Sequence, residues 1–305
     1  MFTTDAHCDT LYSIGVHGAK PETCAVNWER LQAGNVGIQT YALFAGPKGP
    51  AGTPYQDGIK MLDAADQIDT PILRGALPDE PPKTPHGVIS IEGGEMIEGS
   101  LDRLAELDAR VRLRLIALTW NNENEIGHPA KTGPKGGLKP FGLALLREMD
   151  KRGIYADVSH LNEAGFWDTC THANLPPVAS HSNCRWLCPV VRNLRKEQVR
   201  AIIEKGGFIG ANFYTRFLTR KKKSTIEMVF RHIDAICEMG GAKTVGFGSD
   251  FDGIETWPEN LATPADLPNL IDMMRAHGYR QEVLEDIAGL NYWRLLKRAE
   301  AIRAV

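Results

Sequence analysis

Eight short runs of apolar and β-branched residues recur along the 305-residue chain, and segments with helical periodicity lie between most of them. Several runs are almost continuously apolar, which is typical of strands that are buried on both faces of a parallel sheet. The expected strands are residues 2–7, 37–44, 87–92, 113–119, 154–160, 177–181, 207–213 and 244–250.

The intervening segments place apolar residues three and four positions apart, which is the spacing of one helix face. In residues 57–69, for example, Ile59, Leu62 and Ile68 share a face. The other expected helices are residues 101–108, 138–152, 196–205 and 225–239, followed by 266–276, 280–288 and 290–303. Eight strands alternating with helices predict an α/β fold, namely a (β/α)8 TIM-type barrel with extra C-terminal helices.

Domain organisation is expected to be simple. No long linker or shift in composition divides the chain, so we expect a single barrel domain over residues 1–305. Two segments rich in Gly, Pro and Asn, residues 46–53 and 121–137, are expected to form loops over the strand ends.

Charge and composition narrow the class of protein. The formal net charge is −3 and the one basic run, residues 220–223, is isolated, so we expect a solvated loop there and no nucleic-acid partner. The six cysteines show no zinc-finger spacing, which favours reduced thiols. Neither a signal peptide nor an apolar run of 18 residues is visible, so we expect no membrane partner and a cytoplasmic location.

The first candidate for chemistry is the tripeptide His7-Cys8-Asp9, at the end of the first expected strand. Alternate side chains of a strand share a face, so His7 and Asp9 can reach one point together, and imidazole with carboxylate suits a divalent metal such as zinc. Cys8 points the other way and is expected to pack as a small hydrophobic side chain. The alternative is a strand-end pair bonded to loop backbone, because so short a motif is common.

Further ligand-type residues end three of the other expected strands. Glu92 closes an apolar run, where a carboxylate is costly to bury unless it is paired or binds metal, and its two oxygens can bridge two metals. Glu95 lies beyond the following turn and is the less favoured choice. His160 and His181 end two successive strands, 21 residues apart, which favours ligand roles for both.

Asp250 ends the last expected strand and is either a metal ligand or a general base that takes a proton from water. Asp252 is interpreted as a turn residue or as a residue that supports the ligands without binding metal, because Asp-Gly favours turns. The six remaining histidines are interpreted as structural or surface groups in helices or loops. All the candidates fall at the carboxyl ends of strands, which is where barrel enzymes build their active sites.

Six separated motifs resemble those of the membrane (renal) dipeptidase family, whose members are zinc metallopeptidases of the amidohydrolase superfamily. The motifs are His7-Cys8-Asp9, Glu92-Gly93-Gly94, Asp157-Val158-Ser159-His160, Ser180-His181-Ser182, Arg192-Asn193 and Gly248-Ser249-Asp250-Phe251-Asp252-Gly253. The resemblance implies a barrel that holds two zinc ions. It assigns His7 and Asp9 to one zinc, His160 and His181 to the other, and Glu92 to a bridging role.

The same resemblance assigns the acid/base role to Asp250. It assigns the substrate's terminal carboxylate to Arg192, a role that suits the fork of a guanidinium group. We therefore expect a bacterial, cytoplasmic dinuclear zinc dipeptidase, in which a metal-bridging hydroxide attacks the peptide bond of a dipeptide, including dipeptides with a C-terminal D-residue. Analogy with the family suggests a homodimer.

One position departs from the family. Its eukaryotic members carry a substrate-contacting histidine where this chain has Trp120. Either oxyanion stabilisation rests on zinc and Asn121, or the change marks a bacterial-type branch of the family. Two other functions stay open: an amidohydrolase acting on a non-peptide amide, lactam or ester, and a non-catalytic metal-binding protein on a barrel scaffold. The complete ligand set argues against the second, because a buried cluster of charges is costly to retain without a use.

Overall fold

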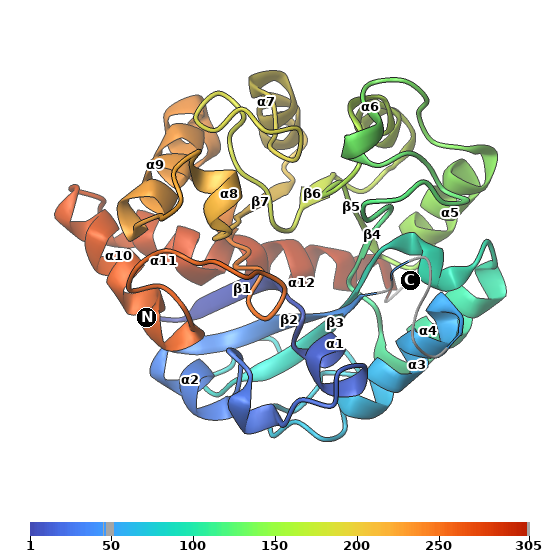
Figure 1. Ribbon diagram of the computed structural model, residues 1–305, viewed down its shortest axis with the longest axis horizontal. Coiled ribbons are helices and arrows are strands. Elements are labelled where there is room, and N and C mark those ends of the chain that lie inside the picture. Colours follow the sequence, from blue (N-terminus) through green and yellow to red (C-terminus); the bar gives the residue numbers. More distant parts are fainter. Residues whose placement is uncertain (45, 47–51, 304–305) are drawn as a thin grey trace.

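The computed structural model describes residues 1–44, 46 and 52–303. The strands of this part of the chain are parallel and close into a barrel in the order β1-β2-β3-β4-β5-β6-β7-β8 (Figure 1), which confirms the predicted (β/α)8 architecture. The strands are β1 (Thr3–Cys8), β2 (Val36–Phe44), β3 (His86–Glu92), β4 (Leu115–Ala117), β5 (Tyr155–Asp157), β6 (Val178–Ala179), β7 (Phe208–Ala211) and β8 (Val245–Phe247).

Every predicted strand is present, but those after β3 are shorter than the apolar runs that predicted them. β2 and β3 stay in register over seven pairs, from Ile38↔His86 to Phe44↔Glu92. In contrast, β6 has only two residues. The backbone therefore leaves the sheet before His160 and His181, and both residues lie just beyond the ends of their strands.

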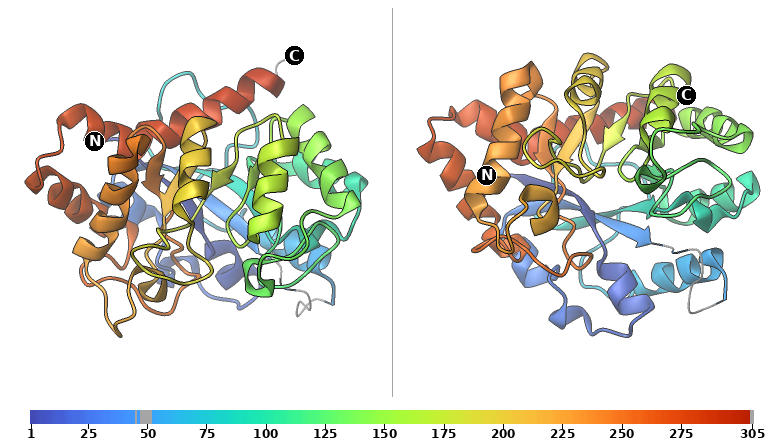
Figure 2. Two further views of the ribbon diagram at one scale, coloured as in Figure 1. Left: turned by 90° about the horizontal axis from the view of Figure 1, so that it is seen from above. Right: turned by 45° about the horizontal axis from the view of Figure 1, so that its top comes forward.

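Helices cover the outside of the barrel, as Figures 1 and 2 show from three directions. The predicted helices correspond to α3 (Pro54–Ala64), α4 (Leu101–Val111), α5 (Pro140–Lys151), α7 (Lys196–Glu204), α9 (Ile226–Ile236), α10 (Leu267–Ala276), α11 (Gln281–Glu285) and α12 (Asn291–Arg303). α3 begins earlier than predicted, because Thr53 accepts a hydrogen bond from the Gln56 N–H and Pro54 occupies the first helical position.

Several short elements were not predicted. They are the helices α1 (Thr10–Gly15), α2 (Trp28–Ala33), α6 (Glu163–His172) and α8 (Thr215–Leu218), with single turns at Pro21–Thr23, Gly94–Ile97, Ala130–Thr132 and Pro264–Asp266. Two further turns, Cys237–Gly241 and Asp286–Leu290, follow α9 and α11 and overlap the predicted helices 225–239 and 280–288. A helix of six residues or fewer, such as α1, α2 or α8, is too short for its apolar positions to repeat.

α12 closes the amino-terminal end of the barrel. The ring of Tyr292 packs 4.9 Å from that of Phe208, the first residue of β7, and its hydroxyl lies 2.8 Å from Thr40 Oγ1. Tyr155, the first residue of β5, donates its hydroxyl to the Leu295 carbonyl at 2.7 Å. These contacts belong to a small apolar core at this end of the barrel, and a larger apolar core contains residues of the surrounding helices and of the strands. α12 therefore covers the amino-terminal ends of the strands, and a functional site can form at their opposite, carboxyl ends.

Some finer expectations were confirmed and one was wrong. His86 begins β3, so it lies in neither a helix nor a loop. Cys8 is buried in the core as predicted, and the six cysteines are free thiols. The basic run 220–223 is exposed, and the loop 121–137 connects β4 to α5, whereas the predicted loop 46–53 lies largely outside the described residues. Among the described helices, none is both long and apolar enough to cross a membrane.

Candidate metal centre and active site

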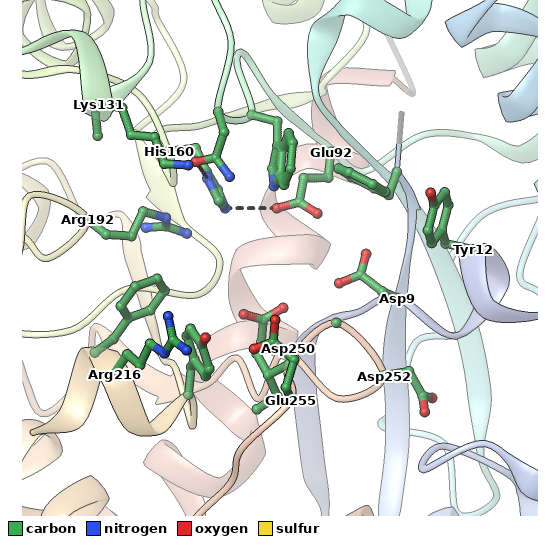
Figure 3. A pocket seen from close by; sticks show the side chains of 18 of the residues that line it. Asp9, Tyr12, Glu92, Lys131, His160, Arg192, Arg216, Asp250, Asp252 and Glu255 are labelled. Atoms are coloured by element: carbon green, nitrogen blue, oxygen red, sulfur yellow. Dashed lines mark hydrogen bonds and ion pairs between the residues drawn. The ribbon is translucent and has the colours of Figure 1, made fainter. Parts of the chain in front are cut away.

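The predicted site residues meet at the carboxyl end of the barrel. Glu92 is the last residue of β3, and the others lie at or just after the ends of β1, β5, β6 and β8. All are buried: His7, Asp9, Glu92, His160, His181 and Asp250. Figure 3 shows four of them, with Asp9, Glu92, His160 and Asp250 around one pocket. The parallel barrel brings these residues together although they are distant in the sequence.

The carboxylate of Glu92 lies at the centre of the group. Its Oε1 atom lies 3.0 Å from His160 Nε2 and 3.3 Å from His181 Nε2. Its Oε2 atom lies 3.5 Å from His7 Nε2, and that nitrogen is also 3.5 Å from Asp9 Oδ2. Each oxygen of Glu92 therefore faces a different set of ligand-type side chains, which is the arrangement a carboxylate needs to bridge two cations.

The polar atoms of this group are poorly satisfied by the protein itself. His7 Nε2 and Asp9 Oδ1 are buried without a hydrogen-bond partner among the described residues. The Nε2 atoms of His160 and His181 face each other at 3.1 Å. A buried polar atom without a partner is costly, and imidazole nitrogens with carboxylate oxygens are the ligands that divalent zinc takes. The residues present therefore fit a dinuclear metal centre.

Electrostatics keep two of the three histidines neutral. Burial, assisted by the charge of Arg192, lowers the pKa of His160 to about 4. Burial and the neighbouring His7 and Arg192 hold the pKa of His181 well below its usual value. Burial also acts to lower the pKa of His7, but the carboxylates beside it, Glu92 first, raise it well above its usual value. A neutral imidazole offers a lone pair, which a metal ligand requires.

The carboxylates repel one another. Burial and then the charge of Glu92 raise the pKa of Asp9 to about 6. Burial raises the pKa of Asp250 well above its usual value, although His7 opposes the shift. Glu92 is the exception, because the surrounding histidines overcome burial and hold its pKa well below the usual range. Such a cluster of buried negative charge is stabilised by cations.

Two site residues adopt a backbone conformation that side chains rarely take. His160 has φ +68° and Asp250 has φ +69°, both in the left-handed region. Residues held in this way cluster at functional sites, because the surrounding structure must compensate the strain. Asp250 is fixed further by its Oδ2 atom, which accepts a hydrogen bond from Asn212 Nδ2 at 2.8 Å.

Asp252 supports the loop beside the candidate metal ligands. Its carboxylate accepts hydrogen bonds from the N–H groups of Ala25 and Val26, at 2.7 and 3.2 Å, and from the Thr10 hydroxyl at 2.7 Å. These bonds tie the loop after β8 to the segment that follows α1. The residue thus belongs to the turn, as the sequence indicated.

A cavity of about 550 Å³ opens above the carboxylates. This volume suits a small-molecule ligand. Its wall includes Arg192, whose guanidinium donates to Ser182 Oγ at 3.0 Å and to the His181 carbonyl at 3.1 Å. The Nε atom of Arg192 is buried without a partner among the described residues, and the group lies 5.6 Å from the ring of Phe217. Part of the guanidinium is therefore still able to donate to a ligand.

Other lining residues escaped the sequence analysis. They include Tyr12, Phe44, Lys131, Tyr214, Arg216 and Phe217. Most belong to loops and short helices, where no periodic pattern marks them. Asn212 follows β7 directly, so the rule that selected the other site residues could have found it. Asn121 lies with its Oδ1 atom 3.3 Å from His160 Nδ1, so it contacts a candidate ligand.

A closed parallel barrel with histidines and carboxylates at its strand ends is an architecture of metal-dependent hydrolases. Comparison with known families narrows this class. The model of the membrane dipeptidase family, peptidase family M19, matches residues 1–305. The chain therefore belongs to the membrane dipeptidase family, and it is a metal-dependent dipeptidase.

Individual relatives agree with this assignment. An uncharacterized protein in the pqqA 5′ region of Klebsiella pneumoniae is 40% identical over 222 residues, which cover 69% of this chain and 80% of that protein. A metallopeptidase from Rhodobacter sphaeroides, liganded with a phosphinate mimic of the dipeptide L-Ala-D-Ala, is 28% identical with a TM-score of 0.87, covering 98% and 99% of the two chains. The metallopeptidase named dipeptidase AC is 29% identical with a TM-score of 0.86, covering 98% of both chains.

Proposed function

We propose that this protein is a dinuclear zinc dipeptidase that hydrolyses the peptide bond of dipeptides, including those with a C-terminal D-residue. The observation that carries the proposal is the position of Glu92, whose two oxygens face His7 on one side and His160 and His181 on the other. Two zinc ions bound there would polarise the substrate carbonyl and supply a nucleophilic water.

The cavity positions the substrate in this proposal. Arg192 receives the terminal carboxylate, because its buried Nε–H has no partner among the described residues and burial favours a charge-assisted bond. Phe44, Trp120 and Phe217 form apolar parts of the wall, which suits side chains flanking a peptide bond. Preference for a C-terminal D-residue draws support from the relative that was seen with an L-Ala-D-Ala mimic.

Asp250 transfers the proton of the reaction as its acid/base residue. It accepts the proton of the attacking water and passes it to the nitrogen of the leaving amine, so that the peptide bond breaks as the new carboxyl C–O bond forms. Asn212 holds Oδ2 of this carboxylate at 2.8 Å, and Oδ1 remains to face the site, 3.8 Å from His7 Nε2. Burial raises the pKa of Asp250, which makes it a stronger base than an exposed aspartate.

The test is the release of free amino acids from matched panels of L-L and L-D dipeptides, before and after chelation and again after zinc is restored. Cleavage that chelation abolishes and zinc restores is the expected result, together with about two zinc ions per chain. No cleavage by a chain that holds two metals would instead favour an amidohydrolase that acts on a non-peptide amide, lactam or ester.

Substrate positioning needs a separate experiment. Arg192→Ala is expected to raise KM strongly for a dipeptide and much less for the same dipeptide with an amidated C-terminus, because only the former has a carboxylate to bind. Equal effects on both substrates would contradict the role of Arg192.

A further inference from the structure

A chain of hydrogen bonds runs beneath His181. Asp157, the last residue of β5, accepts the N–H groups of Ser159 and Ser180 with one oxygen, Oδ1, at 2.9 and 3.0 Å. Its other oxygen, Oδ2, accepts the hydroxyl of Ser180 in a short bond. The Ser180 hydroxyl oxygen lies 2.7 Å from Nδ1 of His181. All of these residues are buried.

The direction of each bond follows from the donors available. A carboxylate can only accept, and a hydroxyl has one hydrogen. Ser180 therefore gives its hydrogen to Asp157, and its oxygen is left to accept from His181 Nδ1–H. A neutral imidazole carries one hydrogen, so Nε2 must hold a lone pair. That lone pair lies on the side of the ring that faces Glu92, whose Oε1 atom is 3.3 Å from Nε2.

We propose that Asp157 and Ser180 are positioning residues that fix His181 in its Nδ1–H tautomer and so present Nε2 as a metal ligand. The use of that ligand by zinc rests on the proposed function, whereas the tautomer does not. Outer groups of this kind alter metal affinity by about 10- to 100-fold in other metal sites.

A matched arrangement on another side of the barrel lacks the imidazole. Asp5 accepts the Ser249 N–H at 2.9 Å with Oδ1 and the Ser249 hydroxyl with Oδ2, which joins β1 to the end of β8. The Ser249 hydroxyl also lies 3.3 Å from the backbone carbonyl of His7, and no imidazole ring contacts it among the described residues. This pair therefore serves as the control, because it has the same buried Asp-Ser bond without a tautomer to set.

The substitution Asp157→Asn is expected to reverse the direction of the side-chain hydrogen bonds between residue 157, Ser180 and His181. The two backbone N–H groups keep the amide oxygen where Oδ1 was, so the new NH2 group faces Ser180 and must donate to it. Among the described residues the Ser180 hydroxyl then has only His181 Nδ1 as an acceptor for its hydrogen, so it donates there and His181 carries its own hydrogen on Nε2. The substitution keeps size and bonding but blocks the ligand atom.

The experiment is a zinc competition titration of the full chain with a chelator. Asp157→Asn is expected to weaken one of the two zinc sites by at least 10-fold. Ser180→Ala frees the tautomer and should weaken that site less, and the double variant D157N/S180A should bind zinc more tightly than D157N alone. Ser249→Ala should keep both affinities. Wild-type affinity in D157N, or a double variant weaker than D157N, overturns the proposal.

A second readout follows the tautomer itself. Nitrogen NMR of the histidine side chains, recorded on the chelated full chain, should show His181 as Nδ1–H in the wild type and as Nε2–H in D157N. The same tautomer in both proteins overturns the proposal. A wild-type chain that binds no zinc would refute the proposed function, and the NMR comparison would still decide the tautomer. If D157N fails to fold, Ser180→Ala decides, since the proposal requires a loss of the fixed Nδ1–H signal.

Discussion

Asp9 and Gly253 approach each other so closely that position 253, in the loop after β8, has no room for a side chain. A Cβ atom on residue 253 would lie 1.9 Å from Asp9 Oδ2 and 2.8 Å from Asp250 Oδ1. The glycine therefore allows a candidate ligand and the candidate base to face the same space.

Gly253→Ala is accordingly expected to displace Asp9 and Asp250 together. A misplacement of about 1 Å at reacting groups costs on the order of 100-fold in rate, so kcat/KM should fall by at least that factor. Steady-state kinetics with a good dipeptide substrate measure the loss. Gly75→Ala is the control, because a Cβ there meets nothing within 4 Å and the residue is exposed with no left-handed backbone conformation. Unchanged kinetics in Gly253→Ala would show that the protein accommodates the new methyl group without displacing Asp9 and Asp250.

Asp250→Asn tests the proton step. The amide keeps the size of the carboxylate but cannot take a proton, and the loss of a general base lowers kcat by about 100- to 10,000-fold. KM for dipeptides and the zinc content should change little, because Arg192 and the five proposed metal ligands are unchanged. A large loss of zinc from the variant, measured by elemental analysis, would make Asp250 a ligand instead.

A buried ion pair holds α12 against the barrel. Arg114 is buried, and it pairs with Glu300 of α12, which also receives Arg112 at 2.6 Å. Glu300→Gln leaves the Arg114 charge buried without its counter-ion, which should lower the free energy of unfolding by about 3 kcal/mol. Urea unfolding gives the value, and Asp79→Asn, which alters the exposed pair with Lys297 at 3.4 Å, should change it by less than about 0.5 kcal/mol.

His232 makes the fold sensitive to acid. Burial lowers its pKa to about 4, and the neutral ring accepts from the Cys184 N–H at 3.1 Å and donates to the Leu218 carbonyl at 3.3 Å. The unfolded chain takes up this proton near pH 6.5, so stability is complete above that pH and falls as the pH drops towards 4. The loss amounts to about 3 kcal/mol.

His232→Gln should remove this part of the pH dependence while keeping one donor and one acceptor. Urea unfolding at several pH values between 7 and 4, at constant zinc, gives the slope for each protein. His172→Gln on the exposed side of α6 should retain the wild-type slope. Parallel slopes in His232→Gln and the wild type would mean that His232 does not supply the effect.

The sequence predicted the fold and the position of the candidate ligands in it, because both follow from the same pattern. Apolar runs mark strands that are buried on both faces, and a polar residue at the end of such a run must lie at the carboxyl end of the barrel. His160 and His181 were located in this way even though β6 has only two residues. Arg192 has no such marker and came from the family resemblance.

What the sequence could not supply depends on contacts between distant segments. Lys131 and Arg216 line the cavity from a loop and from a short helix, and nothing in their local sequence indicates this. α6 was missed because its few apolar residues show little periodicity, although Asn162 caps it by accepting the Gly165 N–H at 2.8 Å. The contact of Asp157 with Ser180 joins two strands and is visible only in three dimensions.

The pairing of β1 with β8 has a consequence for biosynthesis. His7 lies in the first strand of the barrel and Asp250 follows the last, so His7 is synthesised before Asp250, and the two meet only when Asp5 pairs with Phe247. Contacts of such long sequence separation form late, because the chain between them must first be ordered. A chain that has not yet reached β8 therefore already contains the five candidate metal ligands but lacks Asp250, so the candidate acid/base residue is the last part of the site to be added.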